Sequence, residues 1–242
     1  MNNAMRSEWI KLISLRSYLW SLPSYFVVCL AVGSLMGYTS RRADNLDPTA
    51  LGFSGLQSGM LLMVVLGIMA VTNEYSSGTI QTSLLAVPRR ITFYTAKLGT
   101  LMLVTVVLSA VAAPGSFFLV QGILGDSGIS VDATVLARMV GAVAYTTLLV
   151  GFSMGIAMVL RSSTMTLSLL MPVFFMLSTI LTNIPVTRKV AQFLPDMAGS
   201  LVLRQDLAPY SSLNAVTGLA VLAAWAGVAA TAGYISLARR DA

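Results

Sequence analysis

Histidine is absent from the 242-residue sequence, and cysteine occurs once, at Cys29. The usual zinc sites need several histidines and cysteines, and a disulfide within the chain needs two cysteines. A haem held by histidine and an intramembrane protease that depends on histidine are excluded for the same reason. The sequence therefore predicts no metal site, no internal disulfide and no histidine chemistry.

Charge is also scarce, since charged residues make up 10% of the chain, against about 25% in soluble domains. Hydrophobic residues make up 56%, and the mean hydropathy is +0.82. A disordered chain would show the opposite balance. This composition is typical of a helical membrane protein and excludes an ordinary water-soluble one.

Six long stretches contain no Asp, Glu, Lys or Arg. A membrane-crossing helix needs about 20 mostly apolar residues, whereas a barrel strand alternates apolar and polar residues over about 10. The stretches are continuously apolar, so we expect an all-α integral membrane protein with one transmembrane domain over residues 1–242. The expected spans are residues 19–38, 54–72, 98–121, 138–160, 164–182 and 213–237.

The distribution of charge predicts the orientation of these spans. With both termini inside, nine of the fifteen Lys and Arg residues face the cytoplasm, together with three of the nine acids. The whole net charge of +6 then lies inside, as the positive-inside rule expects. We therefore expect cytoplasmic termini, and the basic excess indicates membrane topology and not nucleic-acid binding.

Two segments outside the spans are amphipathic or interrupted. Residues 4–20 predict a helix in the headgroup plane, with Trp9 on its apolar face and Lys11 opposite; the alternative is an extension of the first span. The middle of the last outer segment, residues 193–203, is too short to cross a bilayer. It predicts either a short re-entrant helix or an ordinary outer loop.

We expect no nucleotide-binding domain in this chain. A P-loop needs Gly-Lys-Ser/Thr, and none of the three lysines, Lys11, Lys97 and Lys189, follows a glycine. We expect a non-enzymatic chain, with no cofactor of its own. No Asp or Glu lies within an expected span, Glu74 being the nearest, which disfavours an ion-driven carrier.

The longest inner connection, residues 73–97, carries the most distinctive pattern (NEYSSGTIQTSLLAVPRRITFYTAK). Ser76 or Ser77 predicts the cap of a short helix over residues 79–87, and Pro88 predicts its end.

Ile80 and Leu84 lie on one face of this expected helix. That face either docks into a groove on a partner or lies on lipid. Arg89 and Arg90 follow, where anionic headgroups attract cations.

The run EYSSGTIQTSLLAVPRR resembles the inner loop of bacterial ABC transporter permeases of the type-2 family, the six-span membrane subunits of type V exporters. The N-terminal Glu8-Trp9-Ile10-Lys11-Leu12 is similar to a motif common on their interfacial helix. Leu194-Pro195 and Gly199 resemble the short re-entrant region before their last span. Gln81 departs from the basic residue expected there in many relatives.

The resemblance implies a dimer, formed with a second copy or a homologue, above two ATP-binding subunits that hold ATP and Mg. It implies that residues 73–88 include the cytoplasmic coupling helix between spans two and three. The implied contacts to the ATPase are Glu74, Tyr75, Ser76, Ser77, Gly78, Thr79, Ile80, Gln81, Leu84, Arg89 and Arg90.

The resemblance also implies a substrate pathway at the dimer interface, lined by the second and fifth spans. The candidate residues there are Met60, Met63, Met171, Phe174 and Phe175. Methionine suits irregular apolar ligands, and ordinary packing is the alternative. Pro172 predicts a kink in the fifth span. Gly151 and Gly155 predict close helix packing, which we expect within the chain more than between chains.

The function that follows is the permease subunit of an ATP-driven exporter in the bacterial inner membrane. Its expected substrate is hydrophobic or amphipathic: a drug, a lipid or a peptide. An ion-coupled secondary carrier and a non-transporting immunity or scaffold protein stay open as alternatives.

Overall fold

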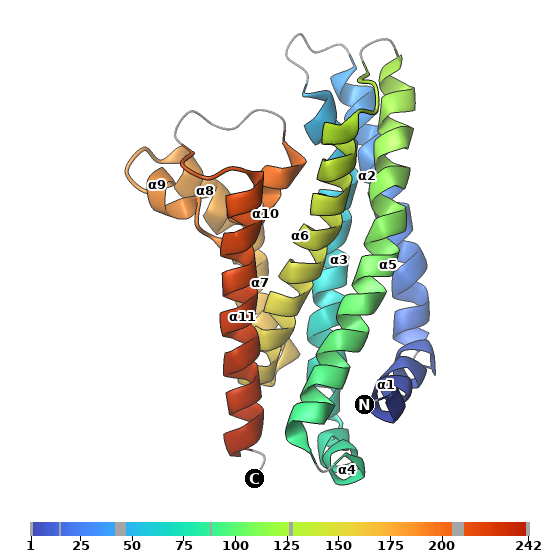
Figure 1. Cartoon of the computed structure of the whole chain (residues 1–242), viewed down its shortest axis with the longest axis vertical. Helices are drawn as coiled ribbons and strands as arrows, with labels where there is room; N and C mark the ends of the chain where they lie inside the picture. The colour runs from blue at the N-terminus through green and yellow to red at the C-terminus, as the bar shows by residue number, and fades with distance from the viewer. Residues whose placement is uncertain are drawn as a thin grey trace.

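The computed structural model describes residues 2–14, 16–41, 47–87, 89–125, 128–204 and 211–240. Within these residues all regular structure is helical. Six helical stretches are long and apolar enough to cross a membrane: Trp20–Ser40, Pro48–Ser76, Arg90–Leu124, Ala133–Leu160, Ser163–Asn183 and Ala215–Arg239. The prediction of an all-α chain with six candidate membrane spans is confirmed (Figure 1).

The bundle is built around α3 (Pro48–Ser76), α5 (Arg90–Leu124) and α6 (Ala133–Leu160). Helix α2 (Arg16–Ser40) packs on α3 and α5, and α11 (Ala215–Arg240) packs on α6 (Figure 1).

The approach of α6 and α11 depends on Gly155. A β-carbon at this position would lie 2.4 Å from the carbonyl carbon of Ala229. The internal packing predicted for this glycine is therefore confirmed.

Several helices begin earlier than predicted. Helix α3 starts at Pro48 because Asp47 accepts hydrogen bonds from the backbone N–H groups of Thr49 and Ala50 at 3.0 and 2.9 Å, and proline is favoured at a first helical position. Helix α5 starts at Arg90 and not at residue 98. These helices extend past the uncharged runs, so charged side chains lie inside them.

The fifth span is interrupted after Pro172. Helix α7 (Ser163–Pro172) passes into a π-helical turn, η2 (Val173–Leu177), and then into α8 (Ser178–Asn183). Proline has no backbone N–H to donate, and both proline and π turns are common places of irregularity in helices. The irregularity predicted at Pro172 takes the form of this turn.

The segment before the last span contains α9 (Arg188–Ala191), α10 (Pro195–Ser200) and a 3₁₀ turn, η3 (Leu201–Leu203). Helix α10 packs against α6 and α11. Its Asp196 is buried and accepts a hydrogen bond from Ser178 Oγ at 2.8 Å, while Tyr145 Oη donates to the Asp196 carbonyl at 3.3 Å. A short helix thus forms in this segment and is packed against the bundle.

The start of α1 (Asn2–Ser14), the whole of α4 (Thr79–Ala86) and the end of α11 lie at one end of the bundle (Figure 1). The segment predicted to be helical over residues 4–20 is helical in α1 and in the start of α2, and residue 15 lies outside the described residues. Lys11 points into the bundle, whereas Trp9 is half-exposed.

Some predicted features lie outside the described residues. These are Pro88 as the end of the short helix and five residues of the charge count, Arg42, Asp44, Asp126, Asp206 and Asp241.

Candidate functional site

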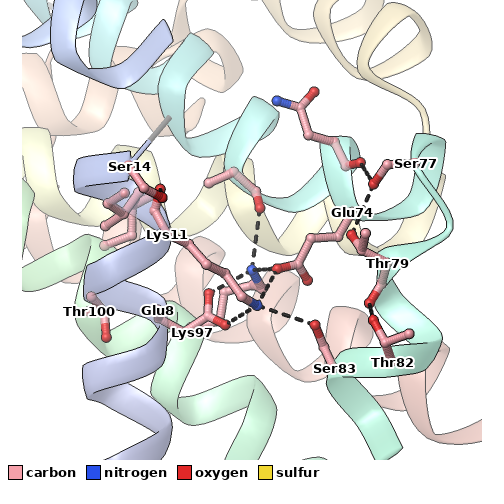
Figure 2. A pocket seen from close by; sticks show the side chains of 14 residues that line it. Glu8, Lys11, Ser14, Glu74, Ser77, Thr79, Thr82, Ser83, Lys97 and Thr100 are labelled. Atoms are coloured by element: carbon pink, nitrogen blue, oxygen red, sulfur yellow. Dashed lines mark hydrogen bonds and ion pairs between the residues drawn. The ribbon is translucent and has the colours of Figure 1, made fainter. Parts of the chain in front are cut away.

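Four charged side chains meet at the end of the bundle that carries α4. Lys11 Nζ lies 2.7 Å from Glu8 Oε1 and 2.8 Å from Glu74 Oε1. Lys97 Nζ lies 2.8 Å from Glu8 Oε2 and 2.9 Å from the same Glu74 oxygen. We call these four residues the ion cluster (Figure 2).

The ion cluster is largely removed from solvent. Glu8, Glu74 and Lys97 are only 7%, 8% and 4% exposed, and the Lys11 side chain is 39% exposed. Buried charges are costly unless they are paired and hydrogen-bonded, and here two carboxylates face two ammonium groups. The cluster joins α1, α3 and α5, and a 3.2 Å bond from Lys11 Nζ to Ser83 Oγ adds α4.

The mutual pairing keeps the α1 members of the cluster charged. Burial alone would raise the pKa of Glu8, but Lys97 and Lys11 outweigh it, so the pKa of Glu8 lies below its ordinary value. Burial alone would lower the pKa of Lys11, but its bonds to Glu74 and Glu8 outweigh it, so the pKa of Lys11 is raised. Both groups are therefore ionised at neutral pH.

Sequence reasoning selected only Glu74 from this cluster. A signal was present, because Glu8 and Glu74 are the only glutamates and Lys11 and Lys97 are two of three lysines. Glu74, which lies just beyond the expected span 54–72, belongs to the helical stretch Pro48–Ser76, since α3 continues beyond the uncharged run.

The short helix predicted over residues 79–87 is present as α4, Thr79–Ala86. The predicted serine cap is wrong, because Gly78 precedes α4 with φ of 70° and no side-chain cap bond. Ser76 Oγ and Ser77 Oγ both donate to the Asn73 carbonyl, at 3.1 and 2.6 Å. They therefore finish α3, and a left-handed glycine makes the turn into α4.

Helix α4 has one face packed on the chain and one face exposed. Ile80 is buried in the core, and Leu84 packs partly against it. Leu85 is 81% exposed, and Gln81 and Thr82 are exposed beside it. The apolar face that we predicted to contact a partner or lipid thus contacts this chain, and a different face is open.

The other predicted ATPase contacts are divided between the surface and the interior. Thr79 and Arg89 are exposed. Tyr75 is half-buried beneath the Arg161 guanidinium, which lies 5.1 Å from its ring centre. Arg90 is half-buried, and its Nη1 donates to the Leu237 and Ala238 carbonyls at 3.2 and 2.8 Å.

The five residues predicted for the substrate pathway do not share one surface. Met60 and Met63 are buried in the core of this chain. Met171 and Phe174 pack partly against that core, and Phe175 is exposed.

Among the described residues, no three His, Cys, Asp or Glu side chains gather where they could hold a metal ion. No protein-family model matches the sequence, and no curated protein matches it. The function is therefore inferred from the geometry of this chain.

Proposed function

We propose that this chain is the membrane-spanning permease subunit of an ATP-driven ABC exporter. It would work as a dimer in the bacterial inner membrane with both termini in the cytoplasm. A separate subunit would bind ATP and Mg and hydrolyse ATP, and the substrate would be hydrophobic or amphipathic.

The observation that carries this proposal is the way in which α4 packs on the bundle. The helix lies at the end of the bundle where the chain starts and finishes, between α3 and α5 in sequence (Figure 1). Ile80 anchors one face in the core, while Leu85 presents an apolar side chain on the opposite face. A helix held on one side and exposed on the other is suited to dock into a groove on a partner.

The ion cluster gives α4 a connection to the spans. Ser83 on α4 accepts a bond from Lys11, which is paired with Glu74 on α3. Lys97 on α5 pairs with the same carboxylate. A force applied to α4 by closing ATPase subunits would therefore reach α1, α3 and α5 through direct contacts.

The remaining elements fit the same arrangement. Trp9 and Ile10 are exposed on α1, as in a helix that lies along a headgroup layer. Helix α10 lies toward the end of the bundle away from α4 (Figure 1), and we assign it as the short re-entrant element on the outer side.

The test is affinity purification of the full chain from its native membranes in a mild detergent, followed by mass spectrometry. We expect a stoichiometric P-loop ATPase with the unmodified chain and its loss with Leu85→Glu. Val186→Glu is the matched control, because Val186 is 86% exposed in the connection between α8 and α9, two helices that lie toward the end of the bundle away from α4 (Figure 1). A chain that emerges without an ATPase from several mild detergents contradicts the proposal.

An ion-coupled carrier is a second candidate, favoured by the buried carboxylate of Glu74 within a candidate span. It is the weaker one, because two lysines already neutralise that carboxylate. Substrate uptake driven by an ion gradient without ATP, and abolished by Glu74→Gln, would favour it.

A further inference from the structure

A cavity of about 570 Å³ lies beside the ion cluster, between α1, α3, α4 and α5. Ligand pockets for small molecules commonly measure about 300–1,000 Å³. Figure 2 shows the cluster residues and several hydroxyl side chains around this cavity.

The two lysines of the cavity have no donor left for an anion. Lys11 Nζ bonds Glu8, Glu74 and Ser83. Lys97 Nζ bonds Glu8 and the Ala70 carbonyl and pairs with Glu74. An ammonium group has three N–H donors, so both are fully used. The two carboxylates and two ammonium groups also sum to zero, so the cluster offers no net charge to an ionic ligand.

Two buried polar atoms on residues that line the cavity have no hydrogen-bond partner within the part of the chain that the structure describes. They are Glu74 Oε2 and Thr100 Oγ1, on residues that are 8% and 3% exposed. An unsatisfied buried acceptor is unfavourable, so a donor from outside the chain would stabilise this oxygen. In Figure 2 the second oxygen of Glu74 carries no dashed line.

The rest of the lining has a polar and an apolar part. Hydroxyl side chains come from α4 and the turn before it, among them Thr79 and Ser83. Leu12 and Leu101 are apolar, and they also line a neighbouring cavity of about 50 Å³ that includes Trp9. An occupant that matched both parts would be amphipathic.

We propose that this cavity binds a neutral, hydroxyl-bearing amphiphile, such as a lipid with an uncharged glycerol or sugar headgroup. A ligand hydroxyl donates to Glu74 Oε2, a second hydroxyl bonds Thr100 Oγ1, and the apolar part lies along Leu12 and Leu101. The site belongs to one chain and does not depend on the proposed ATPase contact.

The test uses the full chain in lipid nanodiscs, with bound ligand counted by native mass spectrometry. The probes are 1-monooleoylglycerol, oleylamine and oleate, which share an apolar chain and carry a neutral, a positive and a negative headgroup. We expect saturable binding of one monooleoylglycerol per chain, at least tenfold tighter than either charged probe.

Two variants connect this binding to the cavity. Thr100→Val removes a hydroxyl that has no hydrogen-bond partner among the described residues, so the fold is retained and binding weakens about two- to tenfold. Ala70→Leu fills space in the lining and abolishes the saturable component. The controls are Thr95→Val and Ala110→Leu, which change exposed positions on α5.

Equal binding of the three probes, tighter binding of a charged one, or unchanged affinity in Thr100→Val overturns the proposal. If Ala70→Leu does not fold, the affinity of Thr100→Val for monooleoylglycerol decides whether the ligand binds in this cavity. Recovery of a P-loop ATPase with Thr100→Val, measured in parallel, separates failure of this site from failure of the exporter proposal.

Discussion

Replacing Lys97 by methionine tests the ion cluster most strongly. Methionine keeps the apolar stem within the bundle and removes only the ammonium group. Glu8 Oε2 then loses its 2.8 Å partner, and Glu74 Oε1 loses one of two. Lys11, the most exposed member of the cluster, is left as the single cation for two buried carboxylates.

The expected loss of stability is large. Removing one partner of a buried ion pair costs about 3–5 kcal/mol, and in a chain of this size 1 kcal/mol shifts Tm by about 2–4 °C. Lys97→Met should therefore lower Tm by roughly 6–20 °C in nanodiscs. The control is Lys189→Met at the remaining, exposed lysine, where we expect a change within about 0.5 kcal/mol.

The pH dependence gives a second readout. In the unmodified chain the pKa of Glu8 is lowered, so its stabilisation is present above its ordinary pKa and is lost as pH falls through the lowered one. Without Lys97, two of the four interactions that lower the pKa of Glu8 are lost while its burial remains, so this pKa is higher than in the unmodified chain. The Tm deficit of Lys97→Met should then shrink as pH falls from about 7 to about 5. A Tm within about 2 °C of the Lys189→Met control at pH 7 would refute the reasoning.

Three further predictions concern single positions. Gly78→Ala forces a β-carbon at φ of 70°, so we expect a loss of about 1–2 kcal/mol and faster hydrogen exchange in α4, with Gly78→Asn closer to the unmodified chain. Burial raises the pKa of Asp196 to about 6, despite the bond from Ser178. The stabilisation that the protonated group gives is lost as pH rises through this value, so the free energy of unfolding should increase by roughly 1 kcal/mol when pH falls from 7 to 5. Asp196→Asn should remove this pH dependence in thermal unfolding. Gly155→Leu drives its side chain into the Ala229 backbone and should lower Tm by at least about 5 °C, whereas Gly227→Leu, with open space at its β-carbon, should not.

The number and type of spans were predictable because hydrophobic length is local information. The first and last residues of each span were less predictable, because we assumed that charged residues lie outside the helices. Helix α5 begins at Arg90 and contains Lys97, and a charge is tolerated there because its partners come from other helices.

The ion cluster itself joins residues far apart in the chain. Glu8 and Lys97 are 89 positions apart, and no local spacing indicates that they meet. At the turn into α4 the two serines indicated a helix end, but a serine at a helix end can make either of two hydrogen bonds. A serine can cap the helix that follows or hydrogen-bond the helix that precedes, and Ser77 does the second.

The central claim, that α4 faces an ATPase, is tested most directly by photo-crosslinking in native membranes. In one variant a photo-reactive amino acid would replace Gln81 on the exposed face of α4. In a second variant it would replace Val186, which lies beyond α8. We predict that the adduct at position 81 contains a P-loop ATPase and that the adduct at position 186 does not. Adducts at position 81 that contain only lipid, or an ATPase captured equally at both positions, would contradict the account.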